Sequence, residues 1–207
     1  MDDTTVDSAI RFDEGIFSVL REEGIPYDRE EMIATTIPLG VSGTARLFRD
    51  LGIGGTVESI QTRIEAAMAH LYTHRVACKA GSLESLRQLY NEGHRLFTLT
   101  ATSHALADVC LKQNDLYDLF EQVWCTDDFG LSKQNPALFH EVAHTIGVAP
   151  DCIHYFDDST IALESARAAG FHTYGVYNGQ TDEEIAYIKS RHSGFITHFS
   201  ELSAISL

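Results

Sequence analysis

Two adjacent carboxylates, Asp157 and Asp158, stand where the periodicity of the sequence changes. Residues 153–156 before them form a short apolar run with the length and composition of a buried strand. From Ser159 onward, small and apolar residues recur at helical spacing as far as Gly170, which suits the position just after a helix. The pattern predicts a strand, an acidic turn and a helix. In an open α/β sheet, such a turn lies at the carboxyl edge of the strands, where ligands bind.

The chemistry that this acidic pair favours is the binding of a hard divalent cation. Neighbouring like charges repel each other, and a cation such as Mg²⁺, which prefers carboxylate oxygens, holds both groups ionised. A simpler interpretation remains open, because Asp158 or Ser159 could merely cap the helix that follows. The pair alone does not decide between a metal site and a helix cap.

Strand and helix patterns alternate from residue 79 onward, and these elements would position the acidic turn. The predicted strands span residues 96–100, 122–126, 153–156, 171–177 and 195–197. Short connections between alternating strands and helices are typical of a parallel sheet with right-handed crossovers. The predicted fold class is therefore α/β, with a Rossmann-like parallel sheet as its core.

Residues 10–78 have a different hydrophobic pattern, because helical patterns follow one another there and no strand is predicted. This predicts an all-helical domain of about four helices. It would be inserted into a core domain formed by residues 1–9 and 79–207. The glycine-containing segment 40–44 is predicted to be a loop of the helical domain.

Length and composition exclude several classes of protein. The 207 residues, 44% of them hydrophobic, suffice for one core with one insertion. A net charge of -15 opposes binding to the phosphate backbone of nucleic acids. No apolar run reaches the ~18 to 20 residues of a membrane span, and the acidic N-terminus does not resemble a signal peptide. We therefore expect a cytoplasmic monomer or homodimer whose cysteines are reduced core residues, namely Cys78, Cys110, Cys125 and Cys152.

Two further residues stand at similar places in the α/β part. Thr100 ends a predicted strand and leads into a polar turn, and Lys133 precedes Pro136 by three residues at the start of a helix. Together with Asp157 and Asp158, these motifs resemble the haloacid dehalogenase-like superfamily in residue type, order and spacing. The similarity is to the branch with an inserted helical cap, which includes phosphoglycolate phosphatases and beta-phosphoglucomutases, and it covers the whole chain.

The first motif of that family, Asp-x-Asp-x-Thr, is matched from its second Asp onward. Asp2 takes the place of the second Asp, Asp3 a position often held by glycine, and Thr4 the place of the threonine. The first Asp is the family's nucleophile, and it would directly precede Met1. We therefore expect the functional chain to extend upstream by about eight mostly apolar residues that form a strand ending in Asp.

The resemblance implies a Mg²⁺-dependent phosphatase that acts on a small phosphorylated metabolite through an aspartyl-phosphate intermediate. Mg²⁺ would be bound by the upstream nucleophile, the backbone carbonyl of Asp2 and the carboxylate of Asp158, with Asp157 as a further ligand or the partner of one. Asp2 would protonate the leaving group and then activate water. The phosphoryl group would contact Thr100, Ala101 and Lys133.

Other functions remain open. A sugar phosphomutase uses the same scaffold, and a chain that truly begins at Met1 would be an inactive phosphate-binding module. The sequence His140-Glu141-x-x-His144 has the spacing of a zinc metalloprotease, with Glu141 as base. Pro150 stands where the longer form of that motif has its third ligand, and the helix is predicted to lie away from the carboxyl edge. We therefore interpret this match as accidental.

Overall fold

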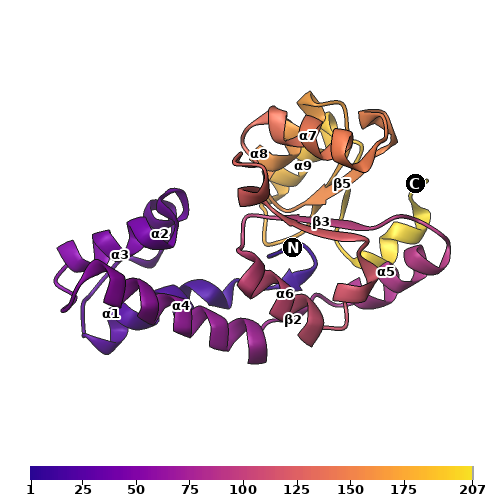
Figure 1. Ribbon diagram of the computed structural model, residues 1–207. Helices are drawn as coiled ribbons and strands as arrows, with labels where there is room; N and C mark the ends of the chain where they lie inside the picture. Colours follow the sequence, from indigo (N-terminus) through magenta and orange to yellow (C-terminus); the bar gives the residue numbers. More distant parts are fainter. Residues whose placement is uncertain (207) are drawn as a thin grey trace. The chain divides into compact units, whose positions relative to one another are not determined.

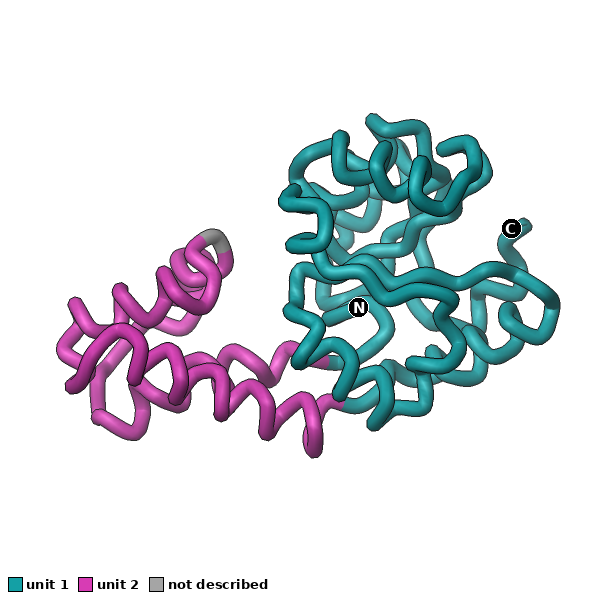
Figure 2. Tube along the Cα trace, viewed as in Figure 1, with its two compact units in different colours: residues 1–7, 77–207 teal, residues 8–76 magenta. Residues whose placement is uncertain are grey.

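The computed structural model describes residues 1–206, with Pro38 described by its backbone alone. Its element order is shown in Figure 1, and Figure 2 shows its division into two compact units. The larger unit comprises Met1–Asp7 and Ala77–Leu207, and the smaller unit is Ser8–Val76. The predicted boundaries, after residues 9 and 78, each lie two residues further along the chain. Helices alternating with parallel strands confirm the predicted α/β fold class.

The strands of the larger unit form two separate parallel groups. In the first, β3 (Phe97–Thr100) pairs with β4 (Gln122–Cys125). In the second, β5 (His154–Asp157) pairs with β6 (His172–Val176), and β6 pairs with β7 (Gly194–Ile196). Within residues 1–206 the predicted parallel sheet is interrupted between β3 and β5, because no strand in this range pairs with the second edge of either strand.

Helices connect these strands, and their ends follow local sequence rules. The Asn135 side chain accepts a hydrogen bond from the Ala137 N–H before α7, and Thr181 and Glu184 form a capping box before α9. Gly147 ends α7 with φ of 80°, a conformation that glycine adopts without steric cost. The helices are α5 (Ser82–Asn91), α6 (His104–Gln113), α7 (Pro136–Ile146), α8 (Thr160–Ala168) and α9 (Asp182–Arg191). Short 3₁₀ helices span Tyr117–Leu119, Thr126–Asp128, Pro150–Cys152 and Phe199–Ala204.

Aromatic packing under α7 fixes the position of β5. Phe139 of α7 is fully buried, and its ring makes edge contacts with Tyr155 and Phe171 at centroid distances of 5.1 and 5.6 Å. Burial of large rings in such arrangements stabilises a core beyond their area alone. The prediction that every cysteine is a core residue is wrong for Cys152, which is exposed because it ends the 3₁₀ turn before β5.

A two-residue ladder joins the two segments of the larger unit. β1 (Val6–Asp7) pairs antiparallel with β2 (Ala77–Cys78), so that Asp7 lies opposite Ala77. The sequence predicts no strand between residues 10 and 78, and β2 contradicts this. A strand of two residues is too short to show the alternating pattern by which strands are recognised.

The smaller unit is helical, as its sequence pattern predicts. Phe17 and Phe48 are fully buried within it, together with Ile60 and Ile64 of its longest helix. The segment 40–44 is not a loop but the first turns of a helix. Its helices are α1 (Ser18–Glu22), α2 (Arg29–Thr36), α3 (Gly40–Asp50) and α4 (Val57–His74), with a π-helical turn at Arg11–Ile16 and a 3₁₀ turn at Ile37–Leu39. Among residues 1–206, no helix combines the length and the apolar character that a bilayer span requires.

Candidate active site

The N-terminal residues form a tight turn at the carboxyl ends of the strands. The Met1 carbonyl oxygen accepts hydrogen bonds from the backbone N–H groups of Thr4 and Thr5, at 3.2 and 2.9 Å. Asp3 has φ of 54°, in the left-handed region that is favourable mainly for glycine. Asp3 therefore carries a steric cost at this position that glycine would not.

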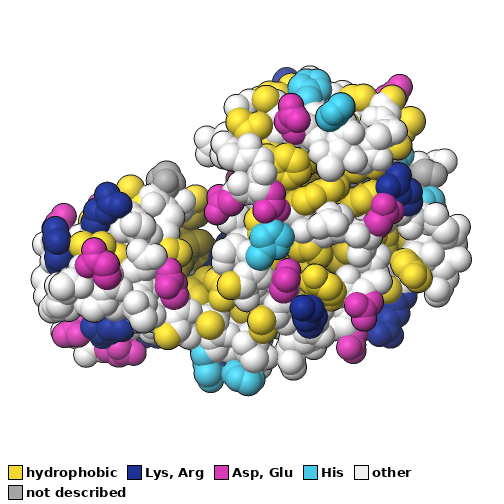
Figure 3. Space-filling view, viewed as in Figure 1, with side chains coloured by type: hydrophobic (Ala, Val, Ile, Leu, Met, Phe, Trp, Pro, Cys, Tyr) yellow, Lys and Arg dark blue, Asp and Glu magenta, His cyan; other side chains and the backbone are white. Residues whose placement is uncertain are grey.

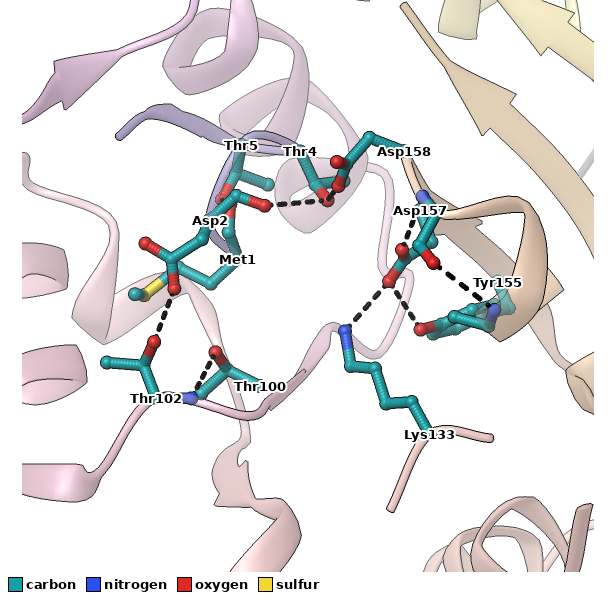
Figure 4. Close-up of polar contacts among 12 residues, drawn as sticks. Met1, Asp2, Thr4, Thr5, Thr100, Thr102, Lys133, Tyr155, Asp157 and Asp158 are labelled. Atoms are coloured by element: carbon teal, nitrogen blue, oxygen red, sulfur yellow. Dashed lines mark hydrogen bonds and ion pairs between the residues drawn. The ribbon is translucent and has the colours of Figure 1, made fainter. Parts of the chain in front are cut away.

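Oxygen atoms of Asp2 and Asp158 converge at this turn (Figure 4). The Thr4 hydroxyl donates a hydrogen bond to Oδ1 of Asp158 at 2.8 Å and lies 3.3 Å from the backbone carbonyl oxygen of Asp2. Gln180 Nε2 donates to the Asp158 backbone carbonyl at 2.9 Å and so holds the acidic turn in place. Burial, followed by the charge of Asp157, raises the pKa of the Asp158 carboxyl above its usual value. A cation beside this carboxylate would relieve that penalty.

Asp157 is buried and pairs with Lys133. Its Oδ2 accepts hydrogen bonds from Lys133 Nζ at 2.8 Å and from the Tyr155 hydroxyl at 2.5 Å, and its Oδ1 accepts one from the Ser159 N–H at 2.9 Å. Burial acts to raise the pKa of Asp157, but the Lys133 ammonium and the hydrogen bonds outweigh it, so the pKa lies below its usual value. Asp157 is therefore ionised in the folded chain, and its carboxylate holds the Lys133 side chain in place.

The turn after β3 holds the side chain of Asp2. Thr102 donates a hydrogen bond from its hydroxyl to Oδ2 of Asp2 at 2.6 Å, and its N–H donates to the hydroxyl oxygen of Thr100 at 3.1 Å. Thr100 is buried, whereas Ala101 is exposed in the turn between them. The two threonines thus connect β3 to the carboxylate of Asp2.

The hydrogen bonds drawn in Figure 4 form two groups that adjoin where Asp157 precedes Asp158 in the chain. Each predicted site residue takes part in one of them except Ala101, which lies exposed in the turn after β3. Three contributors were not predicted. Tyr155 could have been, because it stands two residues before Asp157 on a strand and so faces the same side. Thr102 lies in the polar turn that the sequence analysis identified, but no pattern singles it out. Gln180 has no local signal, because only the turn after β6 brings it to Asp158.

The donor atoms at the turn fit Mg²⁺. The Asp2 carbonyl and the Asp158 carboxylate offer hard oxygen ligands, which this ion prefers. Asp157 is better placed to hold Lys133 than to bind metal, because each of its oxygens already accepts at least one hydrogen bond. Of the two predicted roles for Asp157, this geometry favours that of a partner.

An apolar channel of about 460 Å³ opens beside the site. Its lining includes residues 97–99 of β3, Ile153 and residues 154–156 of β5, and Met1. In Figure 3, hydrophobic side chains show between these strands on the visible face of the larger unit. Met1 is 5% exposed, and burial together with the nearby Lys133 charge lowers the pKa of its amino group.

The protease-like motif lies elsewhere on the larger unit. His140, Glu141 and His144 are exposed on α7. Within the described part of the chain, only His104, Cys125 and Asp128 form a group of three or more residues able to bind one metal ion, and neither motif histidine belongs to it. The pair therefore has no third ligand among residues 1–206.

Comparison with known proteins identifies relatives with the same architecture. The sequence profile of the haloacid dehalogenase-like hydrolases matches residues 1–176. A phosphorylated carbohydrates phosphatase of Thermotoga maritima is 24% identical over 186 residues, which cover 88% of this chain and 85% of the relative.

Two crystal structures share the fold. One is a Thermotoga maritima protein assigned as a beta-phosphoglucomutase, with a TM-score of 0.82 and 20% identity, covering 100% of this chain and 97% of that one. The other, from Haemophilus somnus 129pt, is described as a predicted phosphoglycolate phosphatase; its TM-score is 0.82 at 18% identity, covering 100% and 95%.

Proposed function

Because the chain belongs to the haloacid dehalogenase-like hydrolases, we propose that it is a Mg²⁺-dependent phosphatase of a small phosphorylated substrate. The observation that carries this proposal is the ion pair of Lys133 with the buried Asp157, held beside the converging oxygens of Asp2 and Asp158. Such a site combines a fixed positive charge with ligands for a hard cation. The 24% identical relative is a phosphatase of phosphorylated carbohydrates, which supports the same reaction class.

The residues of the site would prepare the phosphoryl group for attack. A phosphate monoester dianion repels nucleophiles, so its charge must be balanced first. Lys133, whose side chain is 19% exposed, would pair with the phosphoryl oxygens, and the Thr100 hydroxyl would donate a hydrogen bond to them. Mg²⁺, held by the Asp2 carbonyl and the Asp158 carboxylate, would supply Lewis-acid stabilisation of the developing charge. Ala101 would border the phosphoryl group from the turn after β3.

The nucleophile would be part of a residue that is joined to the Met1 nitrogen by a peptide bond. That nitrogen is buried near Lys133, and Met1 lines the channel together with residues of β3 and β5. We propose that an aspartate joined to Met1 provides the attacking carboxylate and forms an aspartyl phosphate, with the preceding strand lying in the channel. Asp2, oriented by the Thr102 hydroxyl, would protonate the leaving oxygen and then take a proton from the attacking water.

Replacement of Asp158 tests the metal part of the proposal on the chain itself. We expect Asp158→Asn to abolish Mg²⁺-dependent thermal stabilisation, which for a bound ion at 100 times its dissociation constant is about 2.7 kcal/mol. Without Mg²⁺ the variant should be at least as stable as the parent, because it removes a buried charge next to Asp157.

Thermal unfolding followed over a Mg²⁺ titration measures both effects. Asp151→Asn, at an exposed position of the 3₁₀ turn Pro150–Cys152, is the matched control and should retain the full Mg²⁺ response. Equal Mg²⁺ stabilisation of Asp158→Asn and its parent would contradict the metal assignment.

In an active chain, release of inorganic phosphate from sugar phosphates distinguishes a phosphatase from a phosphomutase, which would return an isomeric sugar phosphate instead.

A further inference from the structure

A second cluster of potential metal ligands lies at the carboxyl end of β4, outside the hydrogen-bond network of the proposed active site. His104 is the first residue of α6, Cys125 is the last residue of β4, and Asp128 ends the 3₁₀ turn that follows. One ligand atom from each of the three residues lies within 4.8 Å of the others. Nε2 of His104 lies 2.9 and 3.0 Å from the two carboxylate oxygens of Asp128.

The composition of this cluster favours a different ion from the one proposed for the active site. Imidazole, thiolate and carboxylate together are typical ligands of zinc and similar divalent transition metals, whereas Mg²⁺ prefers oxygen ligands alone. Bond lengths of about 2.0 to 2.3 Å place the ligand atoms of tetrahedral zinc roughly 3.2 to 3.8 Å apart. The observed separations would have to change by about an ångström or less to reach this geometry.

Two of the three side chains in this cluster are accessible to solvent, so water can reach an ion bound there. Cys125 is 2% exposed, whereas the side chains of His104 and Asp128 are 47% and 36% exposed. A thiolate is the form of cysteine that binds metal, so a divalent ion would take the place of the proton on the Cys125 thiol.

Asp108 provides an independent observation that points to a bound ion. Its Oδ1 is buried without a hydrogen-bond partner, and it lies 3.7 Å from Nδ1 of His104, one helical turn earlier. Histidines that bind metal through one ring nitrogen commonly donate a hydrogen bond from the other nitrogen to a carboxylate. A metal on Nε2 would place the proton on Nδ1, and a small rotation of the ring would then satisfy the buried oxygen of Asp108.

We propose that His104, Cys125 and Asp128 bind a zinc-type divalent ion, with Asp108 positioning the histidine and water completing the coordination. The ion would connect the first turn of α6 to the end of β4. This site is separate from the proposed Mg²⁺ site and does not depend on phosphatase activity.

Titration of the chelator-treated chain with Co²⁺ tests the proposal, with excess Mg²⁺ present to occupy the all-oxygen site. We expect one equivalent of Co²⁺ to bind and to produce a near-ultraviolet thiolate-to-cobalt charge-transfer band, which Zn²⁺ then displaces. Cys125→Ser should remove the band, and His104→Ala, which removes a ligand, should weaken binding by at least the roughly 10- to 100-fold that loss of a ligand's hydrogen-bond partner costs. Asp108→Asn should weaken binding by about tenfold while the band is retained, as expected for a positioning residue.

Matched controls separate this site from other thiols and histidines. Cys152→Ser removes an exposed thiol, and the double variant His140→Ala with His144→Ala removes the protease-like pair; both should bind Co²⁺ as the parent does. His104→Ala changes an exposed side chain, so it keeps the test valid if Cys125→Ser fails to fold. Absence of the thiolate band from the parent chain, or unchanged Co²⁺ affinity in His104→Ala, would overturn the proposal.

Discussion

A chain extended upstream of Met1 by an apolar strand that ends in aspartate is expected to hydrolyse phosphate monoesters far faster than residues 1–207 alone. Loss of the nucleophile from a covalent mechanism can cost on the order of 10⁶ in turnover. The buried Met1 nitrogen and the adjoining channel are the structural reasons to expect that the added aspartate reaches Lys133. The measurement is phosphate release from a panel of sugar phosphates in the presence of Mg²⁺.

The same extension ending in asparagine is the matched control. It fills the channel equally well and should give the same gain in thermal stability, because its backbone can pair with the edges of β3 and β5. It should give no gain in turnover. Equal turnover for the two extensions, or full turnover for residues 1–207, would contradict the assigned position of the nucleophile.

Lys133→Ala is expected to lower the free energy of unfolding by about 3 to 5 kcal/mol, because it leaves the buried carboxylate of Asp157 without its cation. This is a large share of the 5 to 15 kcal/mol by which domains are typically stable, on the order of a third. Lys79→Ala is the matched control, because Lys79 Nζ donates to the Tyr177 carbonyl and to Asn178 but has no buried carboxylate partner in these contacts. Its loss should cost about 1 kcal/mol.

The pH dependence of this effect has a defined sign. The pKa of Asp157 in the folded chain lies below its usual value, so the ionised pair contributes stability above the ordinary pKa of about 3.9 and loses it as the pH falls further. Urea unfolding should therefore show the largest difference between parent and Lys133→Ala near neutral pH, and a smaller one below about pH 4. The double variant Lys133→Met with Asp157→Asn should recover most of the free energy of unfolding that Lys133→Ala loses, because it leaves no unpaired charge buried. A constant difference at all pH values would show that packing, and not charge, explains the effect.

The fold could be predicted where the sequence shows a clear period. The helix from Pro136 and the strand before Asp157 were predicted within about two residues, because a proline and an apolar run mark their boundaries. The two-residue strand at Ala77 shows no period, and the glycines at residues 40 and 43 resemble a turn. The structure shows that Gly43 instead packs closely against Leu39, since a Cβ there would lie 2.8 Å from the Leu39 Cβ.

The site could be predicted where residue type and strand position agree. Thr100 and the acidic pair stand at strand ends, and Lys133 lies in the turn three residues before α7, positions that a sequence can mark locally. The cluster of His104, Cys125 and Asp128 could not be predicted, because β3–β4 pairing and the α6 crossover bring residues from two separate segments together.

The pairing of β1 with β2 brings the two ends of the helical unit together, so this unit could be exchanged for another. Asp7 and Ala77 are direct partners in that ladder, so the 69 residues of Ser8–Val76 leave and re-enter the α/β unit at neighbouring points. Insertions between such closely spaced ends are well tolerated, because the host fold need not change to receive them. Any helical module whose ends lie a strand spacing apart, about 4.8 Å, could in principle be transplanted into this position. Exchange of the helical unit at this joint would therefore leave the α/β scaffold unchanged.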